Sequence, residues 1–393
     1  MAARRRAKAR GDLSPAATVA ARAIEVVARQ SALVRANLAA AIDGRDPEGV
    51  HDMRVASRRL RAALGVLAPW LPGSDLARVN PGLRAVTRAL GDVREIDVNR
   101  ALLARARTRA TPVREVAIED VDARLARRLR RARVRMMARF ARVDLDRLDE
   151  RLARLVAHLR RATPPMPPAA ATGAGAASAP DRDTASAGPP IDAWFFPGPS
   201  AATETEPAGQ GTPARHPGAP IAELLREAGA RAEAAAIAIV SHPVPSTVGT
   251  PEAHEALHSV RIAAKKLRYL MEIVSPELGP AGGALVRRLR GLQDHLGEFH
   301  DEVVLDAQLA DAIRRATRRG RRLLAAELRR LRRVRHRALL RDERAVRAVL
   351  DDLRGQDFAG DLRRAFEEAL APRPAGERQA EATPGDAPAV RRG

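Results

Sequence analysis

Apolar residues recur along this chain at the three- and four-residue spacing of an α-helix. In one stretch they are Met53, Ala56, Leu60, Leu64 and Leu67, and in another they are Val260, Leu267, Leu270 and Val274. This spacing places the apolar side chains on one face, which predicts amphipathic helices that bury that face. No segment sustains the two-residue alternation of a strand. The pattern therefore predicts an all-α fold of antiparallel bundles joined by short turns.

Helix starts are marked by a capping side chain before a proline. This pair occurs at Ser14-Pro15, Asp46-Pro47, Thr111-Pro112 and Thr250-Pro251. The first residue of each pair can accept a hydrogen bond from the first helical turn, and proline is tolerated there because that turn leaves its N–H groups unused. We also expect long Ala-rich helices over about 14–42 and 221–241.

Residues 163–220 interrupt the helical pattern. This segment is rich in Pro, Ala, Gly, Ser and Thr, which predicts a disordered linker. Its Trp194-Phe195-Phe196 is either a docking motif or an incidental apolar stretch. Residues 1–13 form a basic extension, and residues 372–393 are a second segment predicted to be disordered. Two helical repeats are therefore expected, over 14–162 and 221–371.

One basic helical signature occurs in both repeats. The run from His51 to Arg61 reads H-x-x-R-V-x-x-R-R-L-R, and the run from His258 to Arg268 reads H-x-x-R-I-x-x-K-K-L-R. On a helix, the positions i, i+3, i+7 and i+10 form one stripe about 15 Å long. The two stripes consist of His51, Arg54, Arg58 and Arg61, and of His258, Arg261, Lys265 and Arg268.

A second pair of motifs supports an internal duplication. Leu90-Gly91 and Leu296-Gly297 follow the two stripes, and we expect each pair to form a turn. The stripes are 207 residues apart and these pairs are 206 apart, so a single gap aligns the halves. Residues 1–162 carry a net charge of +18 and residues 221–370 carry a net charge of +5. The first half therefore supplies most of the positive electrostatic field.

The charge of the whole chain favours a polyanionic partner. There are 69 Lys and Arg residues against 48 Asp and Glu residues, which gives a formal net charge of +21. Nearly all the cations are arginines, whose planar guanidinium groups suit bidentate contact with phosphate oxygens. Nucleic acid, polyphosphate and an anionic membrane surface all meet this description.

Several classes of function are excluded or disfavoured. With no cysteine, the chain has no disulfide, no thiol catalysis and no cysteine-ligated zinc. No apolar run is long enough to span a bilayer, and the basic N-terminus lacks the apolar core of a secretory signal, so we expect a cytoplasmic protein. No Walker A loop, dinucleotide fingerprint, G-x-S-x-G elbow or H-E-x-x-H motif is present. We therefore expect no catalytic activity and no cofactor.

A metal site is disfavoured but keeps one weak candidate. His51 and His258 lack a second ligand at i+4 and stand among arginines, so we expect no metal there. His295 and His300 lie near Asp294, Glu298 and Asp301, and this cluster could serve a metal-dependent phosphohydrolase. The other carboxylates after the Leu-Gly pairs, Glu95 and Asp97, and Asp301 itself, are expected to form salt bridges that orient the stripe arginines.

A nucleic-acid-binding protein is the strongest rival interpretation. Single-strand binders use aromatic side chains as stacking platforms, but aromatic residues make up only 2% of this chain. Tyr269 is the one aromatic residue in either signature helix. No zinc finger or RNA-recognition signature is visible. Non-specific binding of DNA or RNA at low salt is still expected from the charge alone.

The motifs resemble those of the CHAD domain, the conserved histidine α-helical domain. The resemblance rests on the two signature helices, the run from Leu90 to Val98, the run from Lys265 to Glu272, and the run from Leu292 to Asp301. It covers about 14–161 and 221–370. Within these runs, Glu95 stands where an aspartate is usual, and His300 where a small polar residue is commoner.

The resemblance implies two helical-bundle repeats with pseudo-twofold symmetry around a basic central groove. It also implies binding of inorganic polyphosphate and association with polyphosphate granules, by a stand-alone domain. The implied groove residues are His51, Arg54, Arg58, Arg59, Arg61, His258, Arg261, Lys265, Lys266 and Arg268. The oligomeric state is left open.

Overall fold

A computed structural model describes residues 18–107, 111–162 and 215–371, and these residues are almost entirely helical. The first half contains α2 (Val19–Ala36), α3 (Leu38–Asp43), α4 (Pro47–Val66), the short 3-10 helix η1 (Ala68–Trp70), α5 (Gly73–Arg107), α6 (Pro112–Val143) and α7 (Leu145–Arg161). The second half contains α8 (Ile221–Val240), α9 (Pro251–Val274), α10 (Gly279–Arg318), α11 (Arg322–Gly355) and α12 (Phe358–Leu370). The all-α prediction is confirmed.

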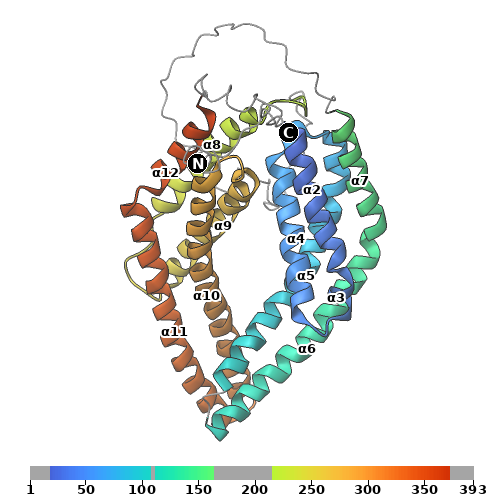
Figure 1. The fold of residues 1–393 in the computed structure, drawn as a ribbon. Helices are drawn as coiled ribbons and strands as arrows, with labels where there is room; N and C mark the ends of the chain where they lie inside the picture. The colour runs from blue at the N-terminus through green and yellow to red at the C-terminus, as the bar shows by residue number, and fades with distance from the viewer. Residues whose placement is uncertain (1–17, 108–110, 163–214, 372–393) are drawn as a thin grey trace, which may run out of the picture.

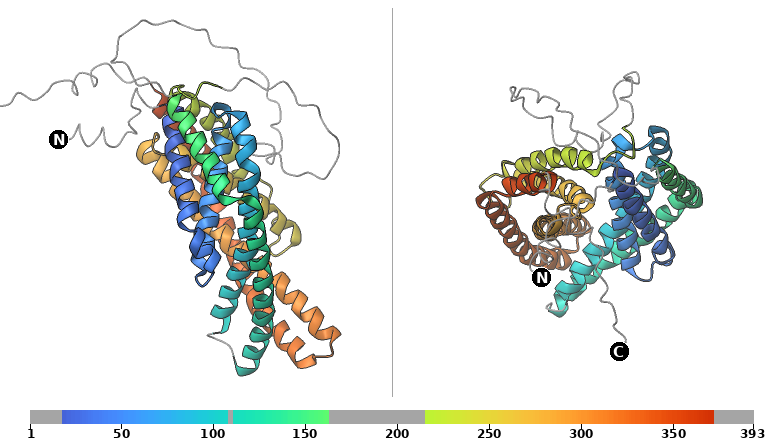
Figure 2. Two further views of the ribbon diagram at one scale, coloured as in Figure 1. Left: turned by 90° about the vertical axis from the view of Figure 1, so that its right-hand side faces the viewer. Right: turned by 45° about the horizontal axis from the view of Figure 1, so that its top comes forward.

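Two bundles stand side by side, and each extends into a long hairpin. The α5–α6 hairpin of the first half and the α10–α11 hairpin of the second half reach the same end of the molecule (Figures 1 and 2). Contacts between the halves join α4 to α9, α5 to α10, α6 to α11 and α2 to α8. When α2 and α3 are counted as one interrupted helix and η1 is left out, each of these pairs occupies the same place in the order of its half, as a twofold relation would require. The symmetry itself stays a prediction.

The capping residues act at two of the predicted starts that the structure describes. Asp46 Oδ1 accepts a hydrogen bond from Glu48 N at 2.9 Å, and Thr250 Oγ1 accepts one from Ala253 N at 3.1 Å. Thr111 precedes α6 without a side-chain hydrogen bond. Ser14-Pro15 lies outside the described residues. The helix expected over 14–42 is two helices, with α2 capped by Thr18 and separated from α3 at Asn37.

The prediction of turns at the two Leu-Gly pairs is wrong. Leu90-Gly91 lies inside α5, and Leu296-Gly297 lies inside α10. A glycine within a helix costs about 1 kcal/mol relative to alanine. Leu90 and Leu296 are completely buried beside these glycines, and that burial outweighs the cost.

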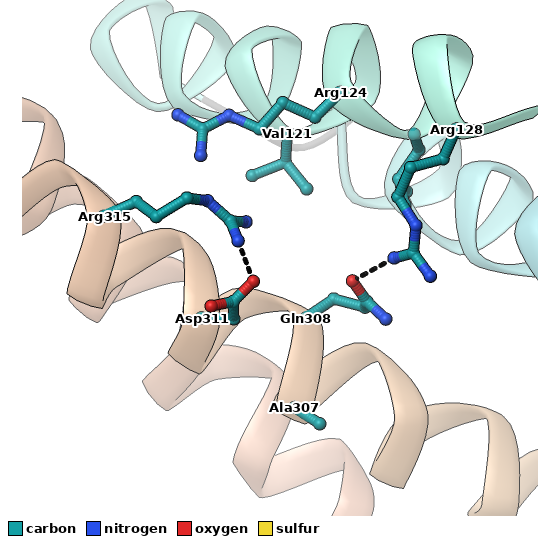
Figure 3. A pocket seen from close by; sticks show the side chains of 8 residues that line it. Val121, Arg124, Arg128, Ala307, Gln308, Asp311 and Arg315 are labelled. Atoms are coloured by element: carbon teal, nitrogen blue, oxygen red, sulfur yellow. Dashed lines mark hydrogen bonds and ion pairs between the residues drawn. The ribbon is translucent and has the colours of Figure 1, made fainter. Parts of the chain in front are cut away.

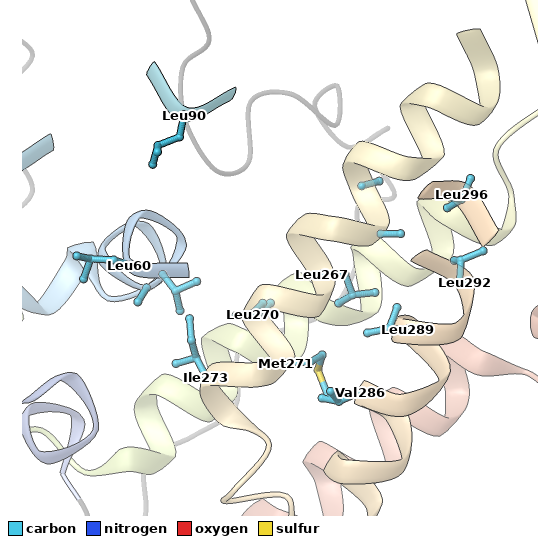
Figure 4. Close-up of a cluster of buried hydrophobic side chains, with 14 of the residues drawn as sticks. Leu60, Leu90, Leu267, Leu270, Met271, Ile273, Val286, Leu289, Leu292 and Leu296 are labelled. Carbon is cyan, nitrogen blue, oxygen red and sulfur yellow. The ribbon is translucent and has the colours of Figure 1, made fainter. Parts of the chain in front are cut away.

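The apolar stripes form one continuous core, as their spacing predicts. Met53, Leu60 and Leu267 are completely buried within it. Figure 4 shows Leu267 and Met271 of α9 beside Leu289 of α10. Because each signature helix buries its apolar row, its basic row is left to face the contact between the halves.

The end of the predicted linker contacts the first half. Ala219 and Pro217 accept backbone hydrogen bonds from the start of α2, at 3.0 and 2.8 Å, and Arg215 N donates to Pro69 O at 2.7 Å. The rest of the linker, including Trp194-Phe195-Phe196, and the extensions 1–13 and 372–393 lie outside the described residues. None of the described helices is long and apolar enough to cross a membrane.

Candidate functional site

The two signature helices, α4 and α9, pack against each other across the boundary between the halves. Between them is a cavity of about 360 Å³, called the central cavity below. It is lined by Arg54, Arg58, Arg61, Ala62, His258, Arg261, Ile262, Lys265, Lys266 and Tyr269. Seven of the ten predicted binding residues line it, so the fold brings most of both stripes to one place.

Like charges crowd one another in this cavity. Burial lowers the pKa of Lys265 to about 6, and the charges of Arg58 and Arg261 add to this effect. Burial also lowers the pKa of Arg54 to about 10, helped by the charge of Arg58. These cations come from both halves, because Arg54 and Arg58 lie on α4 whereas Arg261 and Lys265 lie on α9.

The central cations lack acidic partners. Among the described residues, no carboxylate forms an ion pair with Arg54, Arg58, Arg261 or Lys265, although arginines elsewhere on these helices are paired. Asp301 of α10 is the carboxyl group whose charge acts most strongly on Arg261, and burial raises the pKa of Asp301 itself. Partly buried cations without counterions favour the entry of an anion.

Two predicted binding residues have a different environment. Arg59 Nε lies 3.1 Å from Glu272 Oε2, and Arg268 Nη1 donates to Glu272 Oε1 at 2.9 Å. Arg290 of α10 lies 3.5 Å from the same carboxylate. Glu272 therefore ties α4 to α9 and α10, and neither Arg59 nor Arg268 lines the central cavity.

His51 lies apart from the cavity, near the start of α4. Burial and the charge of Arg94 lower its pKa. Glu48 and Asp52 have carboxylate oxygens close enough to His51 to share a metal ion, a grouping that was not predicted from the sequence. Both carboxylates are exposed, and Arg94 is 3.8 Å from Glu48. We therefore interpret this group as the exposed start of a helix with an ion pair and not as a metal site.

The metal candidate around His295 does not assemble. Within the described part of the chain, the one group of histidines and carboxylates with the proximity of metal ligands is the one around His51. His300 turns instead toward His258, with ring centroids 5.3 Å apart. Burial lowers the pKa of His300 to about 4, with help from Arg261, so both nearby imidazoles are neutral at pH 7.

The expected salt bridges from Glu95, Asp97 and Asp301 are also missing. None of the three forms an ion pair with a described residue, and Glu95 is exposed. Asp97 is buried, and burial raises its pKa against the opposing effect of Arg133. The carboxylate that pairs with an arginine of each signature is Glu272, which lies one turn after the second signature.

Several residues of the site were not predicted. Arg84 and Arg88 of α5 act electrostatically on Arg61, and Arg94 acts on Arg54, so the basic surface continues onto a second helix. Their spacing of four residues, from Arg84 to Arg88, is the signal that could have placed them on one face. Tyr269 lines the central cavity, and the Arg268 guanidinium lies 5.0 Å from its ring centroid.

Comparisons with known proteins agree with this architecture. The CHAD domain model matches residues 25–310, from within α2 to the last quarter of α10. The crystal structure of the CHAD domain from the plant Ricinus communis is similar with a TM-score of 0.55 and 18% identity, over 87% of this chain and 95% of that one. PptA from Streptomyces chartreusis is similar with a TM-score of 0.50 and 19% identity, over 86% of this chain and all of that one. No curated protein sequence matches.

At these identities the solved structures establish the fold alone, whereas the family model matches well over half of the sequence. The doubled signature, the paired helical halves and the family match lead to one conclusion, which is that this chain belongs to the CHAD domain family.

Proposed function

We propose that this protein binds inorganic polyphosphate in the central cavity, without catalysing a reaction on it. The observation that carries the proposal is the convergence of Arg54, Arg58, Arg261 and Lys265, from both halves, without an ion-paired carboxylate. A chain of phosphates supplies the missing negative charge at successive positions. It also fits a stripe of cations better than a single small anion does.

The cations divide the work by their chemistry. The arginine guanidinium groups each offer a planar fork to two phosphate oxygens, and Lys265 offers a point charge once a bound phosphate raises its pKa from about 6. His258 is neutral at pH 7 and contributes a hydrogen bond rather than a charge. Affinity comes mainly from charge neutralisation and from release of counterions, as it does for nucleic-acid phosphates.

The basic surface sets a path for the polyanion. Arg84 and Arg88 of α5 continue the positive charge beyond Arg61, and Arg261 continues it on α9. We assign Arg59 and Arg268 to holding the helices in place through Glu272, and the cavity cations to binding. Residence at cytoplasmic polyphosphate granules follows from the same proposal.

Competition between polyanions tests the proposal. Long-chain polyphosphate, duplex DNA and RNA of equal total charge are titrated against one another over a range of salt concentrations. We expect polyphosphate to bind most tightly at physiological ionic strength, because Tyr269 is the one tyrosine, tryptophan or phenylalanine among the described residues that line the cavity, which leaves few stacking platforms for bases. Equal competition, with all three ligands lost together as salt rises, would instead support a non-specific nucleic-acid-binding protein with a merely cationic surface.

The absence of catalysis is tested separately. The purified protein is incubated with polyphosphate and Mg²⁺ or Mn²⁺, and released phosphate is measured. We expect no release above the protein-free control. Phosphate release that disappears in Asp301→Ala would contradict the proposal and restore the metal-dependent phosphohydrolase.

A further inference from the structure

A second cavity lies between the two halves, and it shares no lining residue with the central cavity. It has a volume of about 430 Å³ and lies between α6 of the first half and α10 of the second (Figure 3). It is called the hairpin cavity here. Its lining residues are Val121, Arg124, Leu125 and Arg128 of α6, with Ala307, Gln308, Asp311 and Arg315 of α10. Their spacing presents one face of each helix to the other.

The carboxylates near this cavity are already shared. Asp311 is paired with Arg315 and lies 3.4 Å from Arg314 on the same helix. Each of these contacts uses a different oxygen of Asp311. One negative charge is therefore divided between two guanidinium groups on the α10 wall.

The α6 wall has the same excess of positive charge. Asp120 lies 2.5 Å from Arg124 Nη2 and 3.7 Å from Arg321, so it too is shared by two guanidinium groups. Arg128 Nη1 donates to Gln308 Oε1 at 2.6 Å, and that partner is neutral. Positive charge on this wall is thus left without full compensation.

Arg124 has a hydrogen-bond donor that the described residues do not use. Its Nη1 atom is buried and has no hydrogen-bond partner among them. Arg315 faces it across the cavity, and burial, together with the charges of Arg124 and Arg128, lowers the pKa of Arg315. An unused buried donor is costly, and an anion that accepted from it would remove that cost.

The size and lining of the hairpin cavity indicate the class of anion. Each guanidinium fork can hold two phosphate oxygens, so Arg124, Arg128 and Arg315 together suit two or three linked phosphate groups. The side chains of Val121 and Leu125 also line the cavity and are almost completely buried, and they are called its apolar floor here. An organic group attached to the phosphates would pack against this floor.

We propose that the hairpin cavity is a second anion site, which binds a di- or triphosphate group through Arg124, Arg128 and Arg315. The phosphates belong either to an inorganic oligophosphate or to a nucleoside triphosphate. Because α6 and α10 belong to different halves, the bound anion links the two hairpins. This proposal is independent of polyphosphate binding in the central cavity.

The test uses the full-length protein with Arg54→Gln and Arg261→Gln, so that the central cavity is weakened. Binding of inorganic tripolyphosphate is measured by isothermal titration calorimetry at physiological salt. We expect Arg124→Gln with Arg128→Gln to weaken this binding by about tenfold or more. The matched control, Arg127→Gln with Arg130→Gln, removes the same charge from exposed positions of the same helix and should change affinity by less than about twofold.

A second pair of variants controls for the possibility that the substitutions on α6 disturb the fold of that helix. Arg315→Gln removes the guanidinium from the opposite wall, and exposed Arg319→Gln is its control. Weaker binding in Arg315→Gln alone supports the site. Equal affinities within each variant pair, or no tripolyphosphate binding at all in the starting protein, would overturn the proposal.

A comparison with ATP identifies the source of the phosphates. Tighter binding of ATP than of tripolyphosphate, reversed by Val121→Ser, would place the nucleoside on the apolar floor. Tighter binding of tripolyphosphate would assign the site to inorganic oligophosphates. Both results require the loss of binding in Arg124→Gln with Arg128→Gln, and without that loss neither assignment stands.

Discussion

Lys265 is one of three lysines in a chain whose other 66 cationic residues, apart from histidine, are arginines. It occupies the most crowded part of the central cavity, where Arg54, Arg58 and Arg261 act on it together. An arginine there would stay charged at neutral pH, but a lysine can release its proton and so relieve the repulsion. The residue is therefore suited to a site that is empty at one time and filled with anion at another.

Polyphosphate binding is expected to take up a proton at Lys265. In the free protein its pKa is about 6, so the amine is neutral at pH 8. Bound phosphate favours the charged form and raises that pKa, so the complex holds about one proton more than its components at pH 8. Affinity should then fall by up to about tenfold per pH unit as the pH rises from about 6 toward the pKa in the complex.

Calorimetry in two buffers of different ionisation enthalpy measures the proton uptake. At pH 8 the imidazoles contribute little, because burial lowers the pKa values of His51, His258 and His300. Lys265→Arg should abolish the uptake, whereas Lys266→Arg, its neighbour on α9, should keep it. Equal uptake in the two variants would contradict the role of Lys265.

The same pKa has a consequence for stability without ligand. The folded protein binds fewer protons at Lys265 than the unfolded chain does between pH 6 and about 10.5, the ordinary value. The contribution of this group to the free energy of unfolding therefore rises with pH across that window. Burial of the ammonium group costs stability at low pH, and that cost is what a bound polyanion offsets.

At the scale of one helix, α4 presents two adjacent arginines to different surroundings. Arg58 faces the central cavity among like charges, and Arg59 reaches Glu272 of α9. Consecutive residues on a helix point about 100° apart, so a single signature serves two faces. The family resemblance assigns both residues to the groove, whereas the structure separates them.

This separation predicts opposite phenotypes for two neighbouring substitutions. Arg58→Gln should weaken polyphosphate binding by about tenfold and leave the free energy of unfolding unchanged or slightly higher, because it removes a like charge. Arg59→Gln should lower that free energy by about 1 to 2 kcal/mol, because it breaks a partly buried ion pair, with affinity changed by less than about twofold.

Chemical denaturation and polyphosphate titration of both variants check the assignment, and each variant is the control for the other. If Arg59→Gln lost affinity as strongly as Arg58→Gln, the Glu272 contact would not be the main role of Arg59. If both variants unfolded alike, the ion pair across the halves would contribute little to stability.

The elements show why the sequence predicted the fold well and the site only in part. The helical period identifies buried residues such as Met53 and Leu267 directly, because one spacing decides which face is covered. Gly91 and Gly297 led to the wrong prediction of two turns. A glycine ends a helix only where the cost of keeping it helical exceeds the free energy gained by burying the neighbouring side chains. Arg59 and Glu272 are 213 residues apart in the sequence, and their pairing depends on how their two helices pack. No local sequence pattern predicts that packing.

At the scale of the molecule, the central cavity exists only because the two halves meet. Counterpart helices contact each other at α4 and α9, at α5 and α10, and at α6 and α11. The first half has a net charge of +18 and the second +5, yet each contributes cations to the cavity wall. The electrostatic field of the net positive charge attracts a polyanion to the molecule, and the cavity at the junction between the halves is where it binds.

Substitutions of Arg54 and Arg261 test whether the two halves bind one polyanion together. Each is the first arginine of its signature, and each acts electrostatically on Lys265. We expect Arg54→Ala or Arg261→Ala alone to weaken polyphosphate binding by about tenfold, because the other half still holds the chain. The double variant should lose about the product of the single effects, since one complex held by both halves then lacks a contact from each of them. Circular dichroism should show the bundle intact, because neither side chain is part of the apolar core.

Exposed Arg127→Ala with Arg333→Ala, one from each half, controls for the loss of two charges and should reduce affinity far less. If each single variant lost less than about twofold and only the double variant bound weakly, either half would be binding polyphosphate on its own. An equal effect of the control pair would mean that net positive charge alone attracts the chain.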